Sequence, residues 1–399
     1  MLTVDAESFL AIVVVAALAA AIVGFGGARL IVPVVVLEIA FGILIGPDVL
    51  GIAQPDEFIE FFSSLGLGML FFFAGYEIDF ERIRGAPLKL ALVGWVISLA
   101  IAYAVGGLLA AAGIALSLLF TGSAIATTAI GTLIPILGDA GEIKTRFGTY
   151  LLAAGAIGEF GPIILITLFF SAGNPISSAL LLLLFVAVAV LAAMLAVRGV
   201  GRGWDAFTRS METSAQLPVR AAVVLVFALA TLATDLGLDL LLGGFVAGII
   251  TRTALGGREV PVLESKLSAV GYGFLIPFFF VASGVAFELD ALVSNPDEFF
   301  KVPLFLAAFL LVRGVPALLL YRRALDARDR LALAFFSSTQ LPLVVAITTI
   351  AIDNGEMRAT TAASLVGAAV LSTAIFPLVG LRLRGSRARS RGSELLAGS

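Results

Sequence analysis

The sequence contains no cysteine and no histidine among its 399 residues. Without thiols and imidazoles the chain lacks disulfides, the usual zinc ligands, a Cys nucleophile and a His acid–base catalyst. A pair of catalytic carboxylates, Glu38 and Glu159, is the enzymatic chemistry that stays conceivable. We therefore expect a protein that is not an enzyme, with no cofactor and no nucleic-acid partner.

Charged residues are also scarce, at 13%, whereas hydrophobic residues make up 60% of the chain. The charged share is about half that of a typical soluble domain. Mostly apolar stretches of about 17 or more residues recur along the whole length, which indicates a bilayer as the solvent. Backbone groups in hydrocarbon must be satisfied internally, and long unalternating runs favour helices. We predict an all-α polytopic membrane protein with 13 transmembrane helices, located in the cell (inner) membrane.

The candidate spans, numbered 1 to 13, lie at residues 9–27, 30–46, 62–79, 88–112, 114–137, 149–171, 176–197, 217–235, 239–251, 267–287, 302–321, 330–352 and 361–380. Lys and Arg gather in the links that follow odd-numbered spans, and the links after even-numbered spans hold only Lys301 and Arg358. The positive-inside rule then places the N-terminus outside and the C-terminus in the cytoplasm. Residues 1–381 would form the membrane domain, and the basic, Ser/Gly-rich tail 382–399 is expected to be disordered.

An internal repeat is visible in the sequence. The run Leu70–Gly75, followed by two acids, resembles Pro277–Gly284, also followed by two acids. Upstream of each run, Gly42–Gly46 resembles Gly244–Gly248. Spans 2 and 3 thus match spans 9 and 10, and a shift of seven spans gives inverted repeats. The alternative is that Gly and Phe are simply common in membrane helices.

Three ionisable residues lie deep inside predicted spans. Arg313, near the middle of span 11, needs a partner, since a buried guanidinium costs about 2.5 to 3.5 kcal/mol even on lenient scales. Glu159 in span 6 and Arg313 lie about 15 and 12 Å from the cytoplasmic ends of their spans, so we expect them to face each other. Glu38 in span 2 is a rival partner. A permanent structural ion pair is the alternative to a transport site.

Two spans carry polar interruptions typical of broken helices. Span 5 contains Thr121–Thr132, rich in hydroxyls and glycine, followed by Pro135, and span 12 contains Ser338, Thr339 and Gln340 before a proline. Paired interruptions at equivalent places of two repeats point to a midplane binding site. The alternative is that these hydroxyls bond back to their own helices. Gly155, Gly158, Gly161 and Pro162, which flank the span 6 acid, would open space beside it.

In their order and spacing these residues resemble the bacterial monovalent cation/proton antiporters, in particular the second branch of that superfamily. The resemblance rests on Glu38–Pro47, on Ala126–Ala129 followed by Ile143–Gly148, on the acid in span 6, on the Phe run before Gly284 and on the basic residue in span 11.

The resemblance implies an antiporter-like fold in which two discontinuous helices cross beside an ion site. It implies a homodimer with a dimerisation panel of about spans 1–3 and 8–10, and a mobile core of about residues 88–171 and 302–380. Glu159 falls on the family's ion- and proton-binding acid, with Thr127 and Thr128 on the unwound crossing. Glu159 and Thr128 would ligate the monovalent cation, and Arg313 falls where the family has Lys or Arg.

One departure from the family pattern concerns Gly158, because many relatives carry a second acid or an amide there. Arg313 stays protonated, so Glu159 is the one obvious proton carrier. We therefore predict electroneutral exchange of Na⁺ or K⁺ for H⁺ by an elevator-type mechanism, with a role in pH homeostasis. The alternatives are a sodium-coupled symporter of an organic anion and a sensor that does not transport.

Overall fold

The computed structural model describes residues 5–26, 33–78, 80–169, 175–202, 204–238, 240–256, 260–294 and 296–397. Within these ranges the chain is helical and contains no strand. Eleven helical stretches in the described ranges are long and apolar enough to cross a membrane. Two shorter apolar helices, α2 (Val34–Ile45) and α12 (Leu240–Ala254), coincide with expected spans 2 and 9. The all-helical membrane architecture is confirmed, and the count of 13 spans stays a prediction.

The chain divides into two compact units. Unit 1 comprises residues 1–22, 37–79 and 163–287, and unit 2 comprises residues 23–36, 80–162 and 288–399. Besides α2 and α12, the helices of unit 1 are α1 (Ala6–Gly26), α3 (Glu57–Glu77), α9 (Pro175–Arg202), α10 (Trp204–Ser210), α11 (Leu217–Asp235), α13 (Pro261–Val270), η2 (Gly271–Leu275) and α14 (Ile276–Val285). Helix α1 ends, and α2 begins, outside the residues of this unit. Those of unit 2 are α4 (Phe80–Ile83), α5 (Ala86–Ala111), α6 (Leu118–Ile125), α7 (Ile130–Asp139), α8 (Arg146–Phe169), α15 (Leu289–Val293), α16 (Pro296–Phe309), η3 (Leu310–Gly314), α17 (Val315–Leu320), η4 (Tyr321–Arg323), α18 (Ala327–Ser337), α19 (Pro342–Asp353) and α20 (Ala359–Ala397).

Unit 1 is held together by glycine contacts that follow the internal repeat. A Cβ atom on Gly42 of α2 would overlap the backbone of α14, and one on Gly284 of α14 would overlap the backbone of α2. Likewise, a Cβ on Gly75 of α3 or on Gly248 of α12 would overlap the backbone of the other helix. Span 2 therefore packs on span 10, and span 9 packs on span 3. Because the repeat makes span 2 equivalent to span 9 and span 3 equivalent to span 10, the two contacts are equivalent as well.

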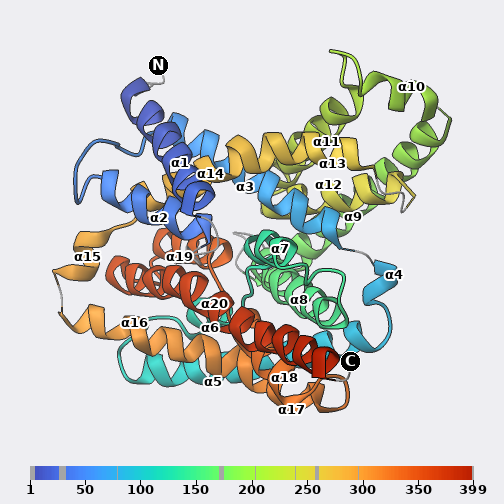
Figure 1. Ribbon diagram of the computed structural model, residues 1–399. Helices are drawn as coiled ribbons and strands as arrows, with labels where there is room; N and C mark the ends of the chain where they lie inside the picture. Colours follow the sequence, from blue (N-terminus) through green and yellow to red (C-terminus); the bar gives the residue numbers. More distant parts are fainter. Residues whose placement is uncertain are drawn as a thin grey trace. The chain divides into compact units, whose positions relative to one another are not determined.

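Unit 2 contains both broken helices. The break between α6 and α7 and the break between α18 and α19 fall in the two hydroxyl-rich segments. The long helix α20 packs along α16 and α18 in this unit (Figure 1). These packed helices hold the breaks inside the protein, where unwound backbone is tolerated in a membrane.

In the described residues, each π-helical turn is followed by a proline after one intervening residue. The π turn η2 is followed by Pro277, and η3, which includes Arg313, is followed by Pro316. Proline lacks an N–H, so the α-helical hydrogen bond it would complete cannot form. Wider π turns within helices are rare and frequent at functional sites. The turn at η3 sets the direction in which the Arg313 side chain leaves the helix.

Arg384, near the end of α20, ties together three segments of unit 2. Its guanidinium binds both carboxylate oxygens of Glu142, which follows α7, at 2.9 and 2.8 Å. It also binds Asp329, in the first turn of α18, at 2.6 Å and lies over the ring of Phe147 at 4.4 Å from its centre. All three charged side chains are at most 14% exposed.

Helix α20 continues beyond residue 381, to Ala397, and the expected disorder of the tail stays a prediction. Arg is a good helix former, and the segment contains no proline after Pro377 to end the helix. Residues 398–399 lie outside the described residues.

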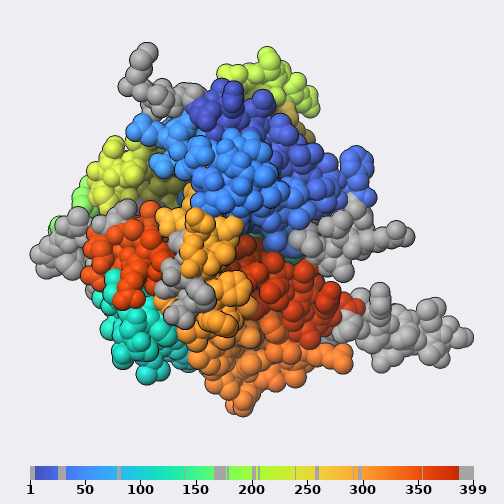
Figure 2. All heavy atoms as spheres, turned by 90° about the vertical axis from the view of Figure 1, so that its left-hand side faces the viewer, coloured from blue at the N-terminus to red at the C-terminus, as the bar shows by residue number. Residues whose placement is uncertain are grey.

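The outer helices of both units carry apolar side chains on their exposed faces. Figure 2 shows α5 (cyan) and α16 (orange) at the surface of unit 2. Exposed side chains of α5 include Leu92, Val96 and Leu108, and α9 of unit 1 exposes a row of Leu and Val side chains. Such faces are unfavourable in water and favourable in hydrocarbon.

Candidate functional site

The two broken helices meet at their unwound segments. The backbone N–H of Ala129 donates to the carbonyl of Thr339 at 2.8 Å. The Thr127 hydroxyl donates to Oε1 of Gln340 at 3.0 Å, and Nε2 of Gln340 donates to the carbonyl of Ile125 at 3.0 Å. These bonds satisfy backbone and side-chain groups that the breaks leave without helical partners.

Helix α20 supplies hydrogen-bond partners for the backbone at the second break. The backbone N–H of Gln340 donates to the Ser372 hydroxyl at 2.9 Å, and its carbonyl accepts from Ser372 and Thr373 at 3.1 and 3.2 Å. Pro342 opens α19, and a residue before proline is disfavoured in helical conformation, so the break at Leu341 follows from the sequence.

The Glu159 carboxylate lies beside the start of α7. This side chain is 1% exposed, and the backbone N–H groups of Ile130 and Gly131 lie close enough to its carboxylate to stabilise the charged form. Both residues begin α7, whose N-terminus carries the positive end of the helix dipole. Within the described residues, atom Oε2 of Glu159 has no hydrogen-bond partner. The carboxylate thus lies near the start of the helix, and its Oε2 atom is an open acceptor.

Arg313 does not pair with Glu159 as expected. Its Nε donates to the Thr128 hydroxyl at 2.8 Å and its Nη2 to the carbonyl of Ala154 at 3.0 Å. Nη1 donates to the Ser98 hydroxyl at 3.3 Å, and a longer 3.4 Å bond runs from Nε to the carbonyl of Ser337.

In the part of the chain that the structure describes, no ion pair joins Arg313 to an acid. The expected direct pair with Glu159 is therefore wrong for this conformation. The physical reason is that Arg313 has other partners, since neutral oxygens surround its guanidinium.

Gly158, which precedes Glu159 in the chain, packs directly against Arg313. Its carbonyl accepts from the backbone N–H of Thr128 at 3.1 Å. A Cβ atom at position 158 would overlap Nη2 of Arg313 and stand within 3 Å of the Thr128 side chain. The guanidinium therefore fills the space that a side chain at this position would need.

The remaining predicted site residues have other roles. The hydroxyls of Ser338 and Thr339 bond back to α18, at 2.7 and 3.4 Å from the carbonyls of Ala334 and Phe335, so the alternative interpretation is correct for these two side chains. Glu38 is 3% exposed on α2 and belongs to unit 1. It is not among the partners of Arg313.

Sequence reasoning missed four contributors. Ser98 is a single hydroxyl in an apolar run, and Ser372 and Thr373 form a similar pair in α20. Lone hydroxyls of this kind are the signal that could have found them. The backbone N–H groups of α7 leave no signal in side-chain composition, and only the position of the break at residues 126–129 points to them.

The arrangement suits a small monovalent guest. Among the described residues no group of three or more Asp, Glu, His or Cys gathers that could hold a metal ion. An open carboxylate oxygen beside a helix N-terminus can accept a proton or a monovalent cation, while hard cations prefer oxygen ligands.

Comparisons with known proteins give a consistent result. A family model described as "Sodium/hydrogen exchanger, transmembrane" matches residues 13–381. The putative Na(+)/H(+) antiporter YjbQ of Bacillus subtilis (strain 168) is 29% identical over 374 residues, covering 88% of this chain and 59% of that protein. The Na(+)/H(+)-K(+) antiporter GerN of Bacillus cereus is 27% identical over 277 residues, covering 66% and 68%.

Among solved structures, the sodium proton antiporter MjNhaP1 from Methanocaldococcus jannaschii is similar with a TM-score of 0.65. The sequences are 18% identical, and the match covers 96% of each chain. This likeness shows the fold. The chain spans 59% of the length of the Bacillus subtilis relative. Because the family model matches nearly all of the chain, this protein belongs to the sodium/hydrogen exchanger family.

Proposed function

We propose that the protein is a secondary active antiporter, and not an enzyme, that exchanges Na⁺ or K⁺ for H⁺ at Glu159. The observation that carries this proposal is the open Oε2 atom of a fully buried carboxylate at the N-terminus of a half-helix. The names of the relatives, which include Na(+)/H(+) and Na(+)/H(+)-K(+) antiporters, support the class of substrate.

A proton and a monovalent cation would compete for the Glu159 carboxylate. The N–H groups at the start of α7 stabilise the charged carboxylate that a cation binds. The Thr128 hydroxyl accepts from Arg313 with one lone pair and has a second, so we propose it as a further cation ligand. Thr127 would hold the crossing in shape through Gln340. A proton on Oε2 removes the charge and with it the cation's main ligand.

The packing at Gly158 supports a one-for-one exchange. Arg313 fills the space beside this residue, which leaves no room for a second acid. Arg313 itself stays protonated. One carboxylate that takes either one proton or one monovalent cation gives an electroneutral cycle.

We further propose an elevator-type motion of unit 2 against unit 1 in a homodimer. Two properties support it: the chain divides into compact units near the expected limits of panel and core, and unit 2 contains both half-helix pairs with Glu159. The distribution of Lys and Arg among the links supports an external N-terminus and a cytoplasmic C-terminus.

The test uses purified protein in proteoliposomes with an internal pH dye. The wild type should release or take up protons when Na⁺ or K⁺ is added, with the same rate whether or not valinomycin and K⁺ clamp the membrane potential. Glu159→Gln should abolish this signal, and Glu7→Gln, at an exposed position, should keep it. Exchange by a well-folded Glu159→Gln protein would contradict the assignment, and sodium-driven solute uptake without proton movement would indicate symport.

A further inference from the structure

Helix α8 contains a proline shortly after Glu159. Pro162 lies inside this helix, and proline has no N–H. The carbonyl four residues earlier, that of Gly158, therefore receives no hydrogen bond from position 162 of its own helix. A proline ring also crowds that carbonyl and bends the helix. Gly158 is buried, and a buried carbonyl without a donor is unfavourable.

The first broken helix supplies the missing donor. Thr128 lies in the unwound segment between α6 and α7, where the backbone N–H groups have lost their helical acceptors. The N–H of Thr128 donates to the carbonyl of Gly158 at 3.1 Å. The proline leaves one group without a donor and the break leaves the other without an acceptor, so the two groups satisfy each other.

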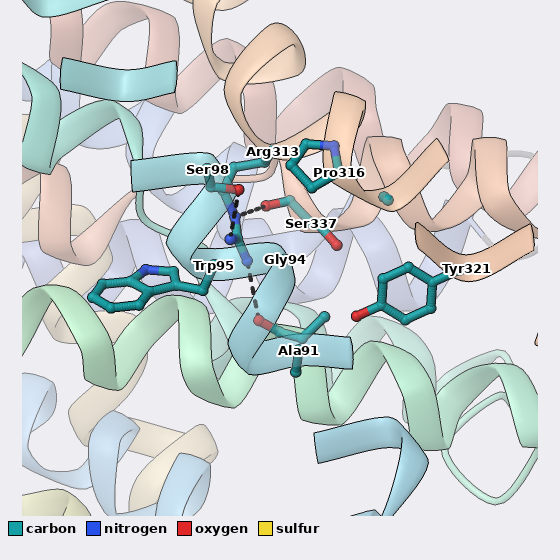
Figure 3. Close-up of a pocket in the computed structure, with 10 residues that line it drawn as sticks. Ala91, Gly94, Trp95, Ser98, Arg313, Pro316, Tyr321 and Ser337 are labelled. Carbon is teal, nitrogen blue, oxygen red and sulfur yellow. Dashed lines mark hydrogen bonds between the residues drawn. The ribbon is translucent and has the colours of Figure 1, made fainter. Parts of the chain in front are cut away.

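This bond lies in a closely packed part of unit 2. A Cβ atom on Gly158 would stand 2.9 Å from the Cβ of Thr128, and one on Gly161 would overlap the ring of Trp95. Trp95 and Arg313 line one small cavity in this part of the unit (Figure 3). A shift of the Gly158 carbonyl would therefore disturb the backbone of the first break.

The position of Thr128 matters because of its hydroxyl. This hydroxyl donates to the carbonyl of Ser337 at 2.5 Å and accepts from Nε of Arg313 at 2.8 Å. The same oxygen is the further cation ligand of the proposed exchange. On the backbone side, the bond to Gly158 holds the residue that carries it.

We propose that Pro162 is a positioning residue for the cation site. It acts through the Gly158 carbonyl, which it leaves to the N–H of Thr128. An alanine at position 162 would return an N–H, which would bind this carbonyl as in a regular helix and draw it away from Thr128. The effect on the cation rests on the proposed function, whereas the hydrogen bond does not.

The first experiment compares hydrogen exchange of the purified full chain in detergent with that of Pro162→Ala. The segment that contains Thr128 should exchange about tenfold faster in the variant, because its amide loses an acceptor. The thermal midpoint should stay the same or rise, since alanine is the better helix former.

The second experiment uses the proteoliposome assay. In Pro162→Ala the KM for Na⁺ or K⁺ should rise about fivefold, which is the effect of one hydrogen bond, while the maximal rate changes little. A proline with a merely structural role would leave KM unchanged. Lactic acid in place of alanine at this position forms an ester without an N–H, and it should recover the wild-type KM.

Pro303→Ala is the matched control. Pro303 also lies inside a helix of unit 2, and in the described ranges no backbone N–H from outside α16 donates to the carbonyl of Phe299, four residues earlier. This variant should keep the wild-type KM and the wild-type exchange around Thr128.

The proposal is overturned if Pro162→Ala keeps the wild-type KM or the wild-type exchange around Thr128. It is also overturned if the ester variant behaves like the alanine variant, because the missing N–H would then not be the cause. A wild type without any cation–proton exchange would contradict the proposed function instead, and the hydrogen-exchange comparison would still decide whether Pro162 holds Thr128 in place.

Discussion

Replacing Gly158 by alanine tests the packing at the centre of the site. The new methyl group would overlap Nη2 of Arg313 and approach Thr128 within 3 Å. Overpacking of this kind costs about 1 to 3 kcal/mol. Displacing Nη2 from the carbonyl of Ala154 removes a charged hydrogen bond worth about 1.5 to 3 kcal/mol. Alanine returns about 1 kcal/mol through its higher helix propensity, so the free energy of unfolding should fall by about 2 to 4 kcal/mol.

The measurement is SDS-induced unfolding in mixed micelles, followed by circular dichroism. Gly107→Ala is the matched control, because Gly107 also lies inside a helix of unit 2 and a Cβ there meets nothing within 4 Å. This control should gain about 0.5 to 1 kcal/mol. If Gly158→Ala is as stable as Gly107→Ala, Arg313 does not occupy the space beside Gly158 and the argument for a single carboxylate fails.

Three further substitutions test other parts of the fold. Gln340→Ala removes the side chain that links the two breaks and should lower the free energy of unfolding by about 2 to 4 kcal/mol in the same assay; a loss below 1 kcal/mol would contradict this role. Gly75→Ala places a methyl group into a neighbouring backbone and should reduce the yield of monodisperse protein severely, whereas Gly68→Ala, whose nearest neighbour would be 3.7 Å away, should purify normally. Arg384→Gln should lower the free energy of unfolding by about 2 to 3 kcal/mol. A double-mutant cycle with Glu142→Gln should give a coupling energy above about 1 kcal/mol, and additive effects would contradict the bond between these two side chains.

Much of the helical architecture could be predicted from the sequence because lipid imposes simple rules. Long apolar runs can only be helices, and Pro342 with its preceding hydroxyls marks a break that the structure contains. The repeat detected in the glycine motifs reappears as glycine contacts between α2 and α14 and between α3 and α12.

The partners of the deep charged residues could not be predicted in the same way. Depth along a helix shows that Glu159 and Arg313 are at similar levels, and it does not show which way each side chain points. Carbonyl groups such as that of Ala154 and N–H groups such as that of Gly131 are present in every residue, so they give no sequence signal. These backbone groups decide that the acid and the base bind neutral partners instead of each other.

The bonds of Arg384 to Glu142 and Asp329 restrict how unit 2 can deform. One guanidinium fastens the turn after α7 to the first turn of α18, and these two half-helices come from different repeats. A tilt of either one would stretch short charged bonds to the other and to α20. The half-helices are thus braced against independent rotation, and a displacement of this part of the molecule would carry Glu159 and the crossing along as one stiff block.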